Sequence, residues 1–214
     1  MESLIVSDIE KFRVNQCDFK QVISFQLRKR THRFLVTDVN TGKKYICKRI
    51  KEPNVISSNN VFCSEIISLC QFHHPTIVPF HGFAINIRKF GLTYHEFMER
   101  GSLKEFIDNN QGELRDQLFD DTRKLIISYG IARSIKYLHS NNIIHQFLNS
   151  TNIFLDSELF PHIRHFEKKI DFEDHDFFSI EEIYSLSPEL YEDFYSFSHS
   201  KAINAYGYAI VLYE

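Results

Sequence analysis

The sequence has no tryptophan. It also has few of the residues that form disulfides or interrupt helices and strands, with seven glycines, five prolines and four cysteines among 214 residues. The cysteines form no Cys-x-x-Cys pair, so we expect neither a zinc cluster nor a disulfide framework. Reduced thiols in a cytoplasmic protein are the expectation instead. The four cysteines are Cys17, Cys47, Cys63 and Cys70.

Long apolar runs and a strong charge of either sign are lacking too. The apolar run at residues 4–6 is cut off by Asp8 and Glu10, and it is too short for a signal peptide or a membrane span. The net charge of −3 gives no general attraction to polyanions. We therefore expect no nucleic-acid partner and no membrane association.

The chain does contain enough apolar residues for a packed core, since 43% of it is hydrophobic and 21 residues are phenylalanine. Residues 1–18 are interpreted as a lead-in segment. Beyond them, alternating apolar residues predict strands, and Asn40-Thr41-Gly42 predicts a hairpin turn between two of them. A helix capped by Asn59 or Asn60 is predicted to run to about residue 72, before His74-Pro75. The predicted strands are residues 19–25, 34–39, 44–50, 77–83 and 90–97.

From residue 101 the apolar spacing becomes that of helices. Ser102 is predicted to cap a short helix ending near residue 108, and Asp120 or Asp121 to cap a long one ending near residue 140. An apolar third helix is predicted over residues 202–214. A β-rich part followed by an α-rich part, with a boundary near residues 96–101, predicts the α+β class.

The segment 143–155, IIHQFLNSTNIFL, is the most informative stretch. Two apolar runs, at residues 143–144 and 153–155, flank a polar loop, which predicts a short strand, a tight loop and a second short strand. Residues 145–152 read H-Q-F-L-N-S-T-N. This frame resembles the catalytic loop of protein kinases, H-R-D-L-x-x-x-N.

Other segments carry the same resemblance, in the family's order and spacing. Tyr45-Ile46-Cys47-Lys48 resembles the family's V-A-I-K strand, and residues 74–78, HPTIV, resemble its HPNIV strand entry. Gly101-Ser102-Leu103 follows the expected hinge, and Ser187-Pro188-Glu189 resembles A-P-E. Residues 204–214, NAYGYAIVLYE, are similar to the corresponding helix of tyrosine-kinase-like members.

The resemblance implies a two-lobed protein-kinase-like fold. It divides the chain into a lead-in segment at 1–18, a β-rich N-lobe at 19–97 and part of an α-rich C-lobe at 98–214. Kinases continue beyond the helix that corresponds to residues 202–214, so the resemblance also implies a C-lobe truncated after this helix.

The resemblance further assigns a degenerate nucleotide site. Lys48 takes the place of the lysine that pairs with phosphate, and Glu65 that of its helix partner. His95 and Glu96 correspond to the gatekeeper and the first hinge residue, and Asn152 to the metal-binding asparagine of the catalytic loop.

The departures from the family pattern fall on the chemistry. Phe147 stands where the catalytic base should be, and a phenyl ring takes no proton. His165 stands at the position of the aspartate of the D-F-G motif, and it is a poor ligand for Mg²⁺. The glycine-rich loop falls on residues 26–31, QLRKRT, which contain no glycine. We therefore expect no catalytic residues, no bound metal and no cofactor.

These features predict a catalytically inactive kinase-like domain, a pseudokinase, that acts as a scaffold or allosteric module with a protein partner. Two alternatives stay open. One is an atypical active kinase that uses ATP and Mg²⁺ with another carboxylate, such as Glu167 or Asp171, as metal ligand. The other is a fragment without function of its own.

Two further clusters are interpreted as solvated loops. Histidines and acidic residues crowd residues 162–176, but their spacing matches no zinc motif. A basic cluster at residues 28–33 lies at the tip of a predicted hairpin, without the interleaved aromatics that single-stranded nucleic acid would require.

Overall fold

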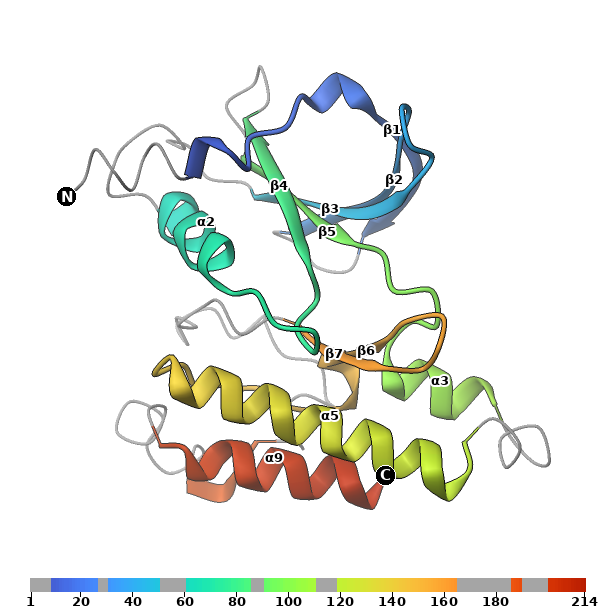
Figure 1. Cartoon of the computed structure of the whole chain (residues 1–214), viewed down its shortest axis with the longest axis vertical. Helices are drawn as coiled ribbons and strands as arrows, with labels where there is room; N and C mark the ends of the chain where they lie inside the picture. The colour runs from blue at the N-terminus through green and yellow to red at the C-terminus, as the bar shows by residue number, and fades with distance from the viewer. Residues whose placement is uncertain are drawn as a thin grey trace. The chain divides into compact units, whose positions relative to one another are not determined.

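The computed structural model of the chain describes residues 9–26, 31–50, 61–85, 91–110, 119–164, 186–189 and 200–214 (Figure 1). The chain divides into two compact units, and each is treated by itself below. The first comprises residues 1–73 and 79–97, and the second comprises residues 74–78 and 98–214.

An antiparallel sheet of five strands forms the first unit, in the order β1-β2-β3-β5-β4. A 3-10 turn, η1 (Gln16–Asp18), leads into it and is capped by the side chain of Asn15. The strands are β1 (Phe19–Gln26), β2 (Thr31–Asp38), β3 (Lys44–Ile50), β4 (Phe80–Ile85) and β5 (Gly91–Glu96). A helix, α2 (Val61–Gln71), connects β3 to β4.

The predicted hairpin turn between β2 and β3 is present, and Asp38 organises it. One carboxylate oxygen accepts hydrogen bonds from the backbone N–H of Asn40 at 2.8 Å and of Thr41 at 3.3 Å. The bond from Asn40 is the largest cause of a lowered pKa of Asp38. Gly42 adopts φ 71°, a conformation that glycine takes without steric cost.

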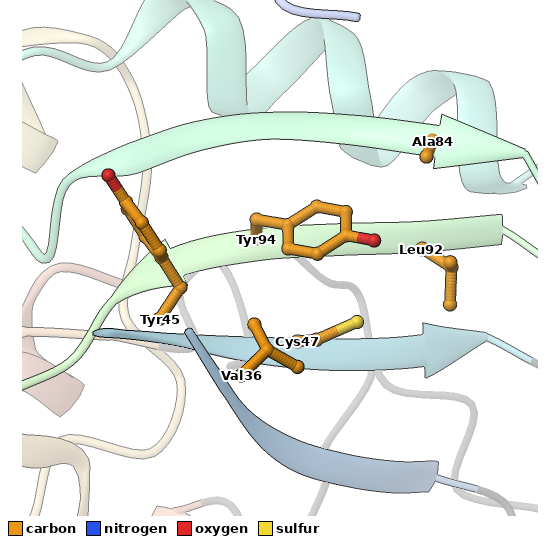
Figure 2. Packing of buried hydrophobic residues seen from close by; sticks show 6 residues of the cluster. All are labelled: Val36, Tyr45, Cys47, Ala84, Leu92 and Tyr94. Carbon is orange, nitrogen blue, oxygen red and sulfur yellow. The ribbon is translucent and has the colours of Figure 1, made fainter. Parts of the chain in front are cut away.

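The two faces of the sheet pack against different residues, because side chains alternate along each strand. One face carries a buried cluster that Figure 2 shows, drawn from four strands: Val36, Tyr45, Cys47, Ala84, Leu92 and Tyr94. Burial within it raises the pKa of the Cys47 thiol to about 12. The other face packs on α2 through a cluster built on Ile66 and Phe83.

Helices dominate the second unit. They are α3 (Leu103–Asn109), α5 (Asp121–Ser140) and α9 (Ala202–Tyr213), with a 3-10 turn η2 (Ser150–Asn152) and a two-stranded sheet of β6 (Ile153–Leu155) and β7 (Pro161–Ile163). Ser102 caps α3 in a full capping box with Glu105, and Asp120 caps α5 through the N–H of Arg123. Together with the sheet of the first unit, these helices confirm the predicted α+β class.

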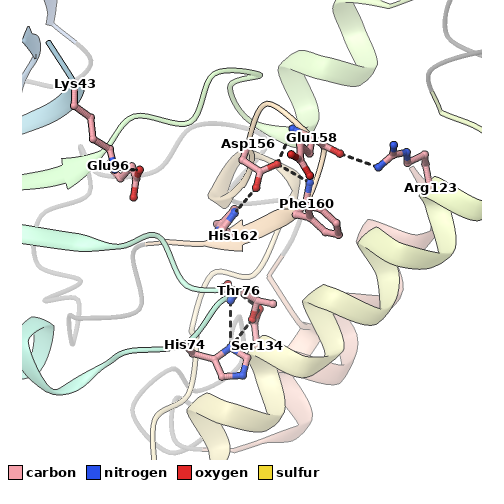
Figure 3. A network of polar contacts seen from close by, with 10 residues as sticks. All are labelled: Lys43, His74, Thr76, Glu96, Arg123, Ser134, Asp156, Glu158, Phe160 and His162. Carbon is pink, nitrogen blue, oxygen red and sulfur yellow. Dashed lines mark hydrogen bonds and ion pairs between the residues drawn. The ribbon is translucent and has the colours of Figure 1, made fainter. Parts of the chain in front are cut away.

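Residues 74–78 join the second unit through hydrogen bonds (Figure 3). The Ser134 hydroxyl on α5 donates to the Thr76 carbonyl at 2.9 Å, and the His74 ring stacks on Tyr137 at 4.6 Å. The backbone N–H of Ile163 donates to the same carbonyl at 2.8 Å. The predicted strand over residues 77–83 is therefore wrong at its start, since β4 begins only at Phe80.

A second local prediction also fails. Residues 143–144 form no strand, because the N–H of Ile143 donates to the carbonyl of Leu138 and continues the end of α5. The partner of β6 is instead β7, which sequence analysis missed because it is short and begins with a proline. Among the described residues, no helix combines the length and the apolar character needed to cross a membrane.

Candidate functional site: a kinase-like catalytic loop

The loop between α5 and β6, residues 141–152, is organised around His145, whose side chain is fully buried. Its Nε2 atom lies 2.8 Å from the carbonyl oxygen of Arg164. A carbonyl only accepts, so Nε2 carries the hydrogen, and Nδ1 is left to accept the N–H of Phe147 at 3.3 Å. Burial lowers the pKa of His145 to about 4, so the ring is neutral near pH 7.

Phe147 lies at the centre of this loop and is only 6% exposed. Its carbonyl oxygen accepts a hydrogen bond from the side-chain Nδ2 of Asn152 at 2.8 Å. The Asn149 side chain in turn accepts from the N–H of Asn152 at 3.1 Å and caps η2. The backbone of the loop is thus fixed by side chains on both sides of a buried, apolar residue.

Asn204, on the first turn of α9, holds the loop through hydrogen bonds, although it lies far from the loop in the sequence. Its side chain is fully buried. Nδ2 donates to the carbonyl of His145, and Oδ1 lies 3.2 Å from the N–H of His145 and 2.8 Å from Nε2 of His139. Sequence analysis gave Asn204 no role, although a lone amide in an otherwise apolar helix indicates a buried polar contact.

Arg164 is a second residue that sequence analysis missed. It is only 5% exposed, and its guanidinium carbon lies 5.8 Å from the ring centroid of Phe154. Its backbone N–H donates to the carbonyl of Asn152 at 3.1 Å. The backbone of Arg164 is therefore tied to the end of the loop, while its guanidinium lies over the ring of Phe154.

In the first unit, the predicted Lys48 lies on β3, where it pairs with Arg33 on β2 and Thr93 on β5. Two residues away, Ile46 is paired with the buried His95, whose ring lies 5.5 Å from that of Phe80. The described strands therefore place two large side chains, those of Ile46 and His95, beside each other on the sheet next to Lys48.

Glu96 ends β5, and its carboxylate forms an ion pair with Lys43 (Figure 3). Its backbone N–H donates to the Pro79 carbonyl at 3.0 Å. Glu65 belongs to α2, but its side chain lies outside the described residues. His165, Glu167, Asp171 and most of the glycine-free stretch 26–31 lie outside them as well.

The described residues offer no cluster of side chains suited to a bound Mg²⁺ ion. Within the described part of the chain, no three His, Cys, Asp or Glu side chains gather so that they could hold a metal. Phe147 offers no oxygen ligand from its side chain. Asn152 could ligate a cation only through Oδ1, and its hydrogen bond to the loop is made by Nδ2.

A family model described as protein tyrosine and serine/threonine kinase matches residues 11–214. The chain belongs to this family. The match confirms the predicted kinase-like, two-lobed fold. The assignment of roles to individual residues of the loop stays a prediction.

The chain is similar to several curated kinases over a minor part of their lengths. It is 34% identical over 128 residues to cysteine-rich receptor-like protein kinase 29 of Arabidopsis thaliana, covering 58% of this chain and 18% of that protein. It is 30% identical over 163 residues to a probable serine/threonine-protein kinase of Dictyostelium discoideum, covering 72% and 11%. A tyrosine-protein kinase receptor of Caenorhabditis elegans is 32% identical over 136 residues, covering 61% and 12%.

Proposed function

We propose that this kinase-family chain is catalytically inactive and acts in signalling as a scaffold or allosteric module for a protein partner. The observation that carries the proposal is Phe147, a buried phenyl ring at the position of the catalytic base. Kinase catalysis consists almost entirely of positioning and electrostatic stabilisation around that base and the metal. The loop keeps the hydrogen bonds that hold its shape and lacks the group that accepts the proton.

The proposal extends to nucleotide binding, which we expect to be weak or absent. Ile46 and His95 put bulk where an adenine ring would lie. Lys48 and Glu65 then link the sheet to the helix and do not serve to bind phosphate. ATP with Mg²⁺ is the cofactor only under the active alternative.

A phosphotransfer assay tests the proposal directly. Purified protein is incubated with labelled ATP, Mg²⁺ and generic protein substrates, beside a Lys48→Ala variant prepared in parallel. We expect equal, background incorporation in both. Incorporation above the Lys48→Ala level would overturn the proposal, because it would show transfer that depends on the phosphate-pairing lysine.

The retained Lys48, Glu65 and Asn152, and the names of the relatives, favour an atypical active kinase as the second candidate. Titration of ATP with and without Mg²⁺, followed by thermal unfolding, separates the two. A saturable rise in Tm that needs Mg²⁺ supports the active alternative, and no rise supports the pseudokinase.

The remaining expectations concern the partner of the chain, its location in the cell and whether it functions alone. We propose a protein partner and a cytoplasmic location, without nucleic acid or membrane. The alternative of a fragment without function is tested by the size and unfolding of the isolated chain. Aggregation without a cooperative transition would support the fragment.

A further inference from the structure

Residues 74–78 are attached to two elements of the second unit, and the two attachments differ in chemistry. Toward β7 the bonds join backbone groups, since the N–H of Val78 donates to the carbonyl of Ile163 at 3.1 Å and the N–H of Ile163 to that of Thr76 at 2.8 Å. Toward α5 they run through the side chains of His74, Thr76 and Ser134 (Figure 3). Backbone amides do not titrate near neutral pH, whereas imidazole does. Only the attachment to α5 can therefore respond to protons.

The three side chains form a continuous row of hydrogen bonds. Nδ1 of His74 lies 2.8 Å from Oγ1 of Thr76, which lies 2.5 Å from Oγ of the fully buried Ser134. Nδ1 also lies 3.3 Å from the backbone nitrogen of Thr76. A backbone N–H only donates, so Nδ1 accepts, and the hydrogen of the neutral ring is on Nε2.

This assignment fixes the direction of the whole row. The Thr76 hydroxyl donates to Nδ1, and the Ser134 hydroxyl donates to Oγ1 of Thr76, so each hydrogen points toward the imidazole. A proton added to Nδ1 reverses the row, because Nδ1 then donates to Thr76 and Thr76 to Ser134. The Ser134 hydroxyl can turn to the carbonyls of Thr76 and Gly130, both at 2.9 Å. The backbone N–H of Thr76 is left facing a donor and loses its acceptor.

The surroundings of the ring oppose that proton. His74 stacks on Tyr137 at 4.6 Å, and its pKa is lowered by burial and by the positive charge of Arg133. Both residues are on α5, and they are the titratable or charged side chains of that helix that face the ring. β7 meets the segment through the backbone of Ile163. A charged ring is therefore less stable on α5 than away from it.

We propose that His74, Thr76 and Ser134 form an acid-sensitive latch, in which the neutral imidazole holds residues 74–76 on α5 and the protonated imidazole releases them while the backbone bonds to β7 remain. The held ring takes up a proton at lower pH than a released ring of pKa 6.5, so the latch is closed above pH 6.5 and opens as the pH falls below it. Between pH 7.5 and pH 5.5 the released state gains up to about tenfold in population. The latch involves no nucleotide and is independent of the proposed pseudokinase role.

The first experiment compares the whole wild-type chain with His74→Asn. An asparagine side chain can accept the N–H two residues later, as Nδ1 does here, and it does not titrate. Amide exchange is followed by NMR at pH 7.5 and pH 5.5. We expect the protection factor of the Thr76 amide to fall about three- to tenfold in the wild type and to stay constant in His74→Asn, with the Val78 amide unchanged in both. A constant Thr76 amide in the wild type, an equal fall at Val78, or an equal fall in His74→Asn would overturn the latch.

The second experiment needs no variant and reads the ring itself. The ¹⁵N signals of the His74 imidazole are recorded in the wild-type chain as the pH is lowered from 7.5. We expect Nε2 to carry the hydrogen and Nδ1 to carry none at pH 7.5, and the ring to protonate below pH 6.5 together with the change at the Thr76 amide. A neutral ring with its hydrogen on Nδ1, or protonation of the ring without any response of the Thr76 amide, would refute the proposal.

Discussion

Acidification should destabilise this protein through His145, and the size of the effect follows from its burial. The folded chain holds the pKa of His145 at about 4, against an ordinary value of 6.5. Above pH 6.5 neither state is protonated, so stability is full. As the pH falls from 6.5 to 4, His145 becomes protonated in the unfolded chain but stays neutral in the folded chain. The folded state therefore loses stability relative to the unfolded state. Between pH 7.5 and pH 4.5 this linkage amounts to about 2–3 kcal/mol.

The measurement is urea unfolding at several pH values, for the wild type and for His145→Gln. Glutamine keeps a side-chain donor for the carbonyl of Arg164 and does not titrate in this range. Other histidines titrate as well, and the difference between the two chains isolates His145. We expect the wild type to lose about 2–3 kcal/mol more than His145→Gln over this range. Equal losses would refute a buried, neutral His145.

Three further substitutions test single contacts within the two units. Asn204→Ala removes the hydrogen-bond partner of two buried backbone groups of His145. We expect the free energy of unfolding in urea to fall by about 2–5 kcal/mol, and by less than about 0.5 kcal/mol for the exposed control Tyr213→Ala. Ser102→Ala removes the capping box of α3 and should cost about 1 kcal/mol by the same assay; no change would contradict the cap. Ile46→Ala, assayed with a fluorescent adenine analogue, should recover some metal-independent binding and no phosphotransfer; unchanged binding would show that bulk at Ile46 does not close the site.

Local features of the fold were predictable because they depend on neighbouring residues. Ser102 and Asp120 both cap helices where the sequence predicted, since a capping side chain reaches only the next turn. The turn at Asn40-Thr41-Gly42 is equally local. Within the frame H-x-x-L-x-x-x-N, the bonds of Asn152 to Phe147 and Asn149 are equally local, whereas His145 is held by Arg164 and Asn204 from distant segments.

Contacts between distant segments were not predictable in this way. The pairing of residues 76–78 with Ile163 cannot be inferred from the alternation of apolar and polar residues in either segment. Pro161 also weakened the strand pattern of β7. Arg164 follows an alternating strand and was not expected to be buried, because burial of a cation depends on partners elsewhere in the fold. The backbone bonds of Phe12 and Val14 to Phe83 were not predicted for the same reason, because they join segments far apart in the sequence.

The assignment of residues 74–78 to the second unit has a consequence for how the chain can be divided. The backbone leaves the first unit after His73, returns at Pro79 and leaves again after Phe97. No single cut therefore yields two intact pieces, because a cut after Phe97 would separate Thr76 from Ser134 and Ile163. The two units are therefore interlaced along the chain, and a piece that ends at Phe97 carries away residues 74–78, which belong to the other unit.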